Sequence, residues 1–271
     1  MADIDKTFGR RAFGADPANY ATARPSYPKW VFGTLRDRCG LGPGAAVFEV
    51  GAGAGTATRA LLAAGADPLV AIEPDARSAD YLRTALALPA LEVRTEAFED
   101  SVLPRAAFDL GVCATAFHWL DEQTALAKVA DALKAGGWWA MLANIFGDPE
   151  RPDPFHEATD ALLNAGPRTP SHGPPAKGPS AGDDEVNARL SGFGRNGRFE
   201  AISHEVRAWE LILDPDQVVA LYSTYSDMNA CPSDERREVL AELRRIAASP
   251  PFSGRVVRNM LTSLWTARRR A

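Results

Sequence analysis

Short apolar runs alternate with stretches of helical spacing along the first half of this chain. The runs are rich in Val, Leu, Ile and Ala, and they predict buried strands at 47–50, 69–72, 91–94, 108–114 and 138–143. Between them, apolar residues three and four positions apart predict helices at 58–64, 75–86 and 122–134. Strands that alternate with helices indicate an α/β fold with a parallel sheet.

After the fifth strand the pattern changes. The segment 166–182 is dense in proline and glycine and lacks apolar residues that could pack, so we expect a linker or lid there. Later apolar patterns predict a short helix at 155–164, a bent strand at 199–209, helices at 214–225 and 233–247, and a last strand at 256–266. The expected parts are an N-terminal arm and helix (1–40), a core (41–147), a lid or linker insertion (148–197) and C-terminal strands with inserted helices (198–271).

Glycines 51, 53 and 55 lie between the first strand and the first helix. A strand, a glycine turn and a helix let a polar cofactor lie on bare backbone at a helix N-terminus. The second strand ends in Glu73, where an acid is placed to accept hydrogen bonds from ribose hydroxyls. This combination fits a dinucleotide or an adenosyl cofactor equally well.

Thr56 and Glu49 distinguish these two cofactors. The dinucleotide fingerprint G-x-G-x-x-G requires glycine where this chain has Thr56. Glu49 precedes the turn, and a carboxylate there repels a pyrophosphate but attracts an ammonium group. S-adenosylmethionine carries an amine and a sulfonium but no phosphate. The acid therefore favours S-adenosylmethionine and speaks against a nicotinamide-dependent oxidoreductase.

Several motifs together resemble the class I S-adenosylmethionine-dependent methyltransferases, and within them the small-molecule group called type 11. The motifs are, in chain order, EVGAGAGT at 49–56, AIEPD at 71–75, FDL at 108–110, AFHWLD at 116–121 and LKAGG at 133–137. The resemblance implies a Rossmann-like, seven-stranded, mostly parallel sheet of order 3-2-1-4-5-7-6 with an antiparallel last strand and a helical cap. It also implies methyl transfer to an oxygen or nitrogen of a small organic molecule.

The resemblance assigns cofactor contacts to the N-terminal arm and to the strand ends. The segment around Arg24 is expected over the methionine end, where its guanidinium could meet the carboxylate. The turn after the third strand is expected to hold the adenine, with the backbone N–H of Phe98 at N1. The residues expected at the cofactor are Tyr20, Arg24, Glu49, Gly51, Ala52, Gly53, Thr56, Glu73, Pro74, Ala97, Phe98, Glu99, Ala114 and Thr115.

His118 follows the fourth strand and is the expected general base, because histidine titrates near neutrality and ligands bind at the carboxyl ends of parallel strands. A structural or substrate-shaping role for this histidine stays open. The residues expected to line the substrate pocket are Tyr27, His118, Trp119, Asn144, Tyr222 and Tyr225. For Trp119, and for Tyr222 and Tyr225 in the helix predicted at 214–225, packing in the core stays open as an alternative.

Composition narrows the function further. A formal net charge of -5 argues against a general nucleic-acid surface, and Arg268–Arg270 is expected to be a solvated tail. The three cysteines are far apart and suggest no disulfide framework, and no signal core or membrane-spanning run is evident. We therefore expect a cytoplasmic enzyme that acts on a small molecule, without nucleic-acid or membrane partners.

The histidines lack the spacing of metal ligands, so no metal is expected. Two alternatives to the methyltransferase stay open: a non-catalytic S-adenosylmethionine-binding protein whose cap serves a partner, and an NAD(P)-dependent oxidoreductase.

Overall fold

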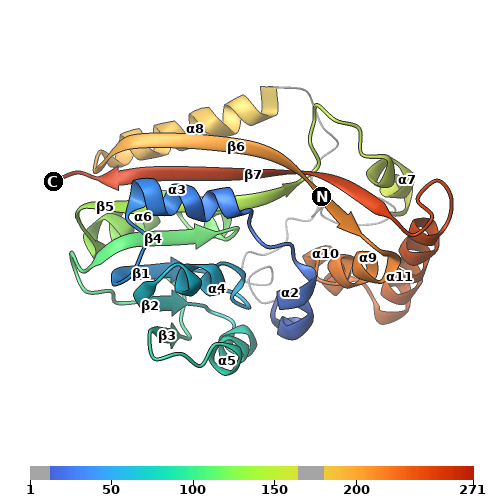
Figure 1. The fold of residues 1–271 in the computed structure, drawn as a ribbon, viewed down its shortest axis with the longest axis horizontal. Coiled ribbons are helices and arrows are strands. Elements are labelled where there is room, and N and C mark those ends of the chain that lie inside the picture. The colour runs from blue at the N-terminus through green and yellow to red at the C-terminus, as the bar shows by residue number, and fades with distance from the viewer. Residues whose placement is uncertain (1–12, 164–179) are drawn as a thin grey trace. The chain divides into compact units, whose positions relative to one another are not determined.

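The computed structural model describes residues 13–163 and 180–271, with side chains from 14 to 163 and from 186 onward (Figure 1). These residues form two compact units. The sheet unit comprises residues 26–143, 180–206 and 262–271, and the helical unit comprises the described parts of 1–25, 144–179 and 207–261. Most of the linker predicted at 166–182 lies outside the described residues.

Seven strands form one sheet of order β3-β2-β1-β4-β5-β7-β6, in which β7 is antiparallel (Figure 1). This topology is the one that the sequence motifs implied. The strands are β1 Ala45–Val50, β2 Ala66–Ile72, β3 Leu91–Arg94, β4 Phe108–Ala114, β5 Leu133–Phe146, β6 Phe199–Leu213 and β7 Val256–Arg269. Since Val50 is in register with Ile72 of β2 and Cys113 of β4, these parallel strands end together, and we call that side of the sheet the carboxyl edge.

Helices cover both faces of the sheet unit. They are α3 Lys29–Cys39, α4 Thr56–Ala63, α5 Ala76–Ala85, α6 Glu122–Ala132 and α8 Ser180–Asn196. Val47 shares a buried cluster with α3 and α4, whereas its neighbour Phe48 shares one with α6 and with Phe193 of α8. Both strand residues are fully buried, as expected for a parallel strand between two helical layers.

The end of α6 differs from the prediction. We expected the helix to reach Lys134, but it ends at Ala132, and Leu133 is already extended and paired with Phe108 of β4. The next registered pair is Leu110 with Trp138, so the residues between form an irregular loop in the strand. Gly136 adopts a φ of 77° there, which explains why a glycine lies at that position.

The C-terminal arginines Arg268 and Arg270 are exposed, as expected, but they do not form a free tail. Arg268 and Arg269 belong to β7 and donate to the carbonyls of Gly136 and Leu133, respectively. Arg270 donates to the carbonyl of Phe199 at 3.2 Å.

The helical unit has a core of its own, to which Phe155, Leu221 and Leu243 contribute. Its elements, apart from strand segments, are η1 Phe13–Ala15, α2 Pro17–Ala23, α7 Pro154–Leu163, α9 Pro215–Tyr222, α10 Ser226–Ala230 and α11 Ser233–Ala248. Three of these helices follow one another between β6 and β7, one more than predicted. No helix in the described ranges is both long and apolar enough to cross a membrane.

Tyr20, one of the residues expected at the cofactor, lies inside α2. Asp16 caps this helix by accepting a hydrogen bond from the amide of Asn19 at 3.0 Å, and Pro17 occupies its first turn. Both are helix-start signals. Only from Arg24 does the backbone become extended.

Candidate cofactor and active site

The glycine turn after β1 has a backbone that only glycine adopts without strain. Gly51, Gly53 and Gly55 all have positive φ. At Gly51 a Cβ would also lie 2.5 Å from the Cβ of Ala116, so the turn after β1 directly contacts the segment after β4. The Gly51 amide donates to the carbonyl of Ile72 at 2.9 Å. The turns that follow three strands are therefore joined at the carboxyl edge.

Glu49 lies beneath this turn and is 1% exposed. Its Oε2 accepts a hydrogen bond from the Thr58 hydroxyl at 2.7 Å, but its Oε1 is buried and has no partner among the described residues. Burial raises the pKa of Glu49 to about 8, the Thr58 bond opposes this shift, and the neighbouring Glu73 adds to it. A buried carboxylate with an unused oxygen suits a cationic ligand group.

Glu73, at the end of β2, fastens the same turn. Its Oε2 accepts from the Gly53 amide at 2.7 Å and its Oε1 from the Asp75 amide at 2.9 Å. Burial raises the pKa of Glu73 to about 7, although these two backbone bonds act in the opposite direction. Each carboxylate oxygen has a second lone pair. Glu73 can therefore hold the turn and still accept a ligand hydroxyl.

The end of β4 carries backbone strain. Thr115 has a φ of 58°, which is unfavourable for a β-branched residue, and such strain clusters at functional sites. Its hydroxyl lies 2.6 Å from that of Tyr27. The short helix η2, Phe117–Trp119, follows directly and brings His118 to the same edge with its side chain exposed. The rings of His118 and Trp119 are 4.7 Å apart.

The turn after β3 contains the residues expected at the adenine. Phe98 is 3% exposed and its ring packs parallel to that of Phe48 at 6.4 Å. Ala97 is half-buried and Glu99 is exposed.

Other predicted residues lie in the helical unit. The Arg24 guanidinium lies over the rings of Tyr20 and Tyr225, at 5.2 and 4.6 Å from their centroids. The Nε of Arg24 and the hydroxyl of Tyr225 are buried without a hydrogen-bond partner among the described residues. Two unused donors in one cluster suit an acceptor such as a carboxylate.

Two further predicted residues of this unit have their polar groups engaged. The Tyr222 hydroxyl accepts from Arg258 Nη1 at 2.6 Å, and Arg258 is also paired with Asp153 at 2.7 Å. Asn144 donates to the carbonyl of Pro25 at 3.2 Å. Arg258 is 1% exposed, so this pair is a buried feature that the sequence analysis missed.

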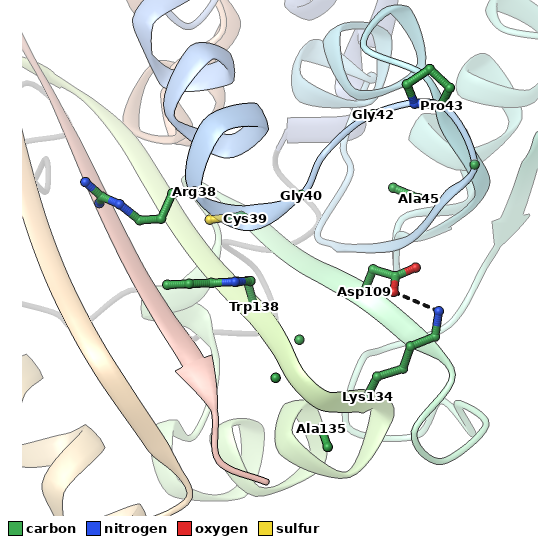
Figure 2. Close-up of a pocket in the computed structure, with 13 residues that line it drawn as sticks. Arg38, Cys39, Gly40, Gly42, Pro43, Ala45, Asp109, Lys134, Ala135 and Trp138 are labelled. Carbon is green, nitrogen blue, oxygen red and sulfur yellow. Dashed lines mark hydrogen bonds and ion pairs between the residues drawn. The ribbon is translucent and has the colours of Figure 1, made fainter.

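A cavity of about 520 Å³ lies at the opposite edge, where β1, β4 and β5 begin (Figure 2). Its charged side chains are paired with one another or with neighbours. Lys134 Nζ lies 2.7 Å from Asp109 Oδ1, whose other oxygen accepts from the Ala46 amide at 3.0 Å. Arg38 is paired with Glu205 at 2.9 Å. The charged side chains that line this cavity are thus paired without a ligand.

Among the residues with described side chains, no group of three or more His, Cys, Asp and Glu could hold a metal ion.

A Rossmann-like α/β protein is defined by this sheet, by the glycine turn at its carboxyl edge and by the acids that end β1 and β2. Residues 48–141 match the type 11 methyltransferase domain. This domain match and the fold support the resemblance of the sequence motifs to class I methyltransferases.

The chain is similar over most of its length to methyltransferases of undetermined activity. It is 25% identical over 242 residues to an uncharacterized methyltransferase of Schizosaccharomyces pombe, covering 89% of each chain. It is 26% identical over 242 residues to one of Mycobacterium tuberculosis, covering 89% of this chain and 87% of the other.

Solved structures share the fold. A candidate type II methyltransferase from Anaeromyxobacter dehalogenans superposes with a TM-score of 0.60 at 20% identity, over 90% of this chain and 97% of the other. Phosphoethanolamine N-methyltransferase 2 of Haemonchus contortus, solved with S-adenosyl-L-methionine, gives a TM-score of 0.58 at 12% identity, over 100% of this chain and 61% of the other.

Proposed function

We propose that this protein transfers a methyl group from S-adenosylmethionine to an oxygen or nitrogen of a small organic molecule. The observation that carries this proposal is the Oε1 of Glu49 next to the glycine turn, which is buried and has no hydrogen-bond partner in the part of the chain that the structure describes. A carboxylate there fits the ammonium group of S-adenosylmethionine and repels the pyrophosphate of a dinucleotide. The formal net charge of -5 supports a small-molecule acceptor over a nucleic acid.

In the sheet unit, the ammonium, the ribose and the adenine of the cofactor each have a matching protein group. Glu49 binds the ammonium, the turn at Gly51, Ala52 and Gly53 gives close backbone approach, and Glu73 accepts from the ribose hydroxyls. The Thr56 hydroxyl, which is also buried without a described partner, adds a polar contact at the start of α4. The turn at Ala97, Phe98 and Glu99 holds the adenine. Pro74, after β2, and Ala114 and Thr115, at the end of β4, line the cofactor site at the carboxyl edge.

In the helical unit, the unused donors of Arg24 and Tyr225 suit a carboxylate. Tyr20 supports Arg24 by lying under its guanidinium. We propose that this cluster binds a carboxylate.

When bound, S-adenosylmethionine supplies an electrophilic methyl group on a sulfonium. The chain's own task is to orient the acceptor in line with that group and to remove its proton. His118 is exposed at the carboxyl edge, and a neutral ring nitrogen can take a proton from an acceptor hydroxyl or ammonium and pass it to water. Trp119 and Tyr27, beside His118 and Thr115, supply apolar surface that excludes water from that end of the site.

The Haemonchus contortus enzyme supports the proposal, because it has this fold and was solved with S-adenosyl-L-methionine. A non-catalytic cofactor-binding protein remains the second candidate, and only a turnover measurement separates it from an enzyme. An NAD(P)-dependent oxidoreductase is disfavoured by Thr56, which replaces a fingerprint glycine, and by Glu49.

Titration calorimetry with S-adenosylmethionine, S-adenosylhomocysteine and NAD tests the cofactor. We expect micromolar binding of the two adenosyl compounds and none of NAD; binding of NAD alone would overturn the proposal. Cell extracts are then screened for acceptors of labelled methyl groups from S-adenosylmethionine. Transfer to a small molecule supports the enzyme, transfer to a macromolecule contradicts the acceptor class, and cofactor binding without any transfer favours the non-catalytic alternative.

A further inference from the structure

The side chain of Lys128, on α6, binds backbone carbonyls of the turn after β3. Its Nζ donates to the carbonyl of Phe98 at 2.5 Å and to that of Glu99 at 2.9 Å. The same ammonium lies 5.1 Å from the centroid of the Phe98 ring. Lys128 therefore fixes both the backbone and the side chain of one residue, Phe98, from a helix on the other side of the turn.

The carbonyls on both sides of the Phe98 amide are turned toward protein donors. The Ala97 carbonyl accepts from the amides of Asp100 and Ser101, each at 3.0 Å. The Phe98 carbonyl accepts from Lys128 and from the Ser101 hydroxyl at 2.9 Å. In a trans peptide the N–H points opposite to the preceding carbonyl. The Phe98 N–H is thereby directed away from these donors, and it has no acceptor among the described residues.

We propose that Lys128 is a positioning residue that holds the Phe98 amide in the orientation required to recognise adenine at N1. This inference rests on the proposed function, since it assumes that the turn receives the adenine of S-adenosylmethionine. Lys128 does not touch the nucleobase in this assignment. It acts through the turn, and its effect should be specific to ligands whose base accepts a hydrogen bond at that position.

The electrostatics of the turn give a second reason for a lysine here. Burial lowers the pKa of Lys128, but Asp100, Glu96 and Glu99 in the turn oppose that shift. The ammonium lies near three carboxylates, whose mutual repulsion it reduces. Loss of this charge should loosen the turn rather than unfold the sheet, because Phe98 remains packed against Phe48.

The test compares two ligands that differ at the base. S-adenosylhomocysteine carries adenine, whose N1 accepts a hydrogen bond, whereas its inosyl analogue carries hypoxanthine, whose N1 is protonated and cannot accept one. Calorimetry is performed on the wild-type chain, on Lys128→Met and on Lys128→Arg. Lys134→Met is the matched control, because Lys134 is an equally paired lysine at the opposite edge.

We expect Lys128→Met to bind S-adenosylhomocysteine about tenfold more weakly, the loss of about one hydrogen bond, and to bind the inosyl analogue almost as the wild type does. Lys128→Arg should restore most of the preference for adenine, and Lys134→Met should leave it unchanged. Equal weakening of both ligands, or no weakening of either, would overturn the inference alone. A wild-type protein that binds neither ligand would overturn the proposed function and this inference with it.

Discussion

The amino and carboxyl edges of the central strands differ in whether their buried polar groups have partners, and this difference distinguishes a candidate binding site from a cavity without one. The amino edge has a cavity of about 520 Å³, but Lys134 and Asp109 neutralise each other there, and Arg38 is paired with Glu205. At the carboxyl edge, Glu49 is buried, its Oε1 has no hydrogen-bond partner among the described residues, and burial raises its pKa to about 8. The useful signal is this buried, unpartnered carboxyl group, not the volume of a cavity.

Backbone strain, by contrast, occurs at both edges. Gly51 at the carboxyl edge and Gly65, which precedes β2 at the amino edge, both have positive φ, and a Cβ at either would lie close to another segment, 2.5 Å from the Cβ of Ala116 and 2.8 Å from the nitrogen of Pro43, respectively. Thr115 has a φ of 58° at the carboxyl edge, and Ala106, before β4, has a φ of 50° at the amino edge. Strain alone therefore does not identify the functional edge.

The largest effect that we predict is on catalysis. His118→Ala should lower kcat by about 100-fold or more, because no side chain would then take the proton from the methylated substrate. The Kd for S-adenosylhomocysteine should change by less than about threefold. Turnover with an identified acceptor and calorimetry measure the two quantities. Unchanged kcat would remove His118 as the general base.

The next largest effect is on the glycine turn. Gly51→Ala should weaken cofactor binding by about 100-fold, because the new Cβ would meet that of Ala116 and force the turn out of position. Gly44→Ala is the matched control. Its Cβ meets nothing within 4 Å, so it should cost only about 1 kcal/mol of stability and leave affinity unchanged. Equal affinities for the two variants would refute the special role of the carboxyl-edge turn.

A smaller loss is expected at the end of β2. Glu73→Ala removes the proposed ribose acceptor and the partner of the Gly53 amide, so we predict about tenfold weaker binding of S-adenosylhomocysteine. Glu92→Ala, a neighbouring exposed acid on β3, is the control and should bind normally. If calorimetry finds Glu73→Ala unimpaired, the ribose lies elsewhere.

The smallest effect should come from the amino edge. Lys134→Met breaks an exposed ion pair with Asp109, which is worth about 0.2–1 kcal/mol. We predict a small decrease in Tm and less than a twofold change in cofactor affinity. A loss comparable to that of Glu73→Ala would show that the cavity of Figure 2 communicates with the cofactor.

Local patterns predicted the strands well, and the resemblance to a known family implied the topology. Apolar runs gave β3 and β4 with their observed bounds, and the succession of motifs implied the strand order that the structure shows. Asp121 caps α6 by accepting from the Thr124 amide at 2.9 Å, a local signal for a helix start. Strand bounds and helix caps depend on residues close together in sequence, so the chain itself predicts them, whereas the strand order depends on distant segments and was implied by the resemblance.

Features that depend on distant partners were missed. Leu133 leaves the helix because it pairs with Phe108, and no local pattern reveals that register. The bond from Thr58 to Glu49 and the contacts of Lys128 with Phe98 join residues whose proximity follows only from the fold. The start of α2 is different, because the Asp16 and Pro17 signals were present in the sequence and could have been recognised.

The most direct test concerns the charge that Glu49 would acquire on cofactor binding. Because its pKa is raised to about 8, the Glu49 side chain is mostly protonated at pH 7 in the free protein. The ammonium group of the bound cofactor should favour the ionised form of Glu49. S-adenosylhomocysteine is titrated at pH 7 in two buffers with different ionisation enthalpies. We predict that the wild type releases protons on binding and that its affinity rises between pH 6 and pH 7.5, and that Glu49→Gln binds more weakly with neither effect. Identical binding and proton balance in the wild type and in Glu49→Gln would contradict the assignment of Glu49 to the cofactor.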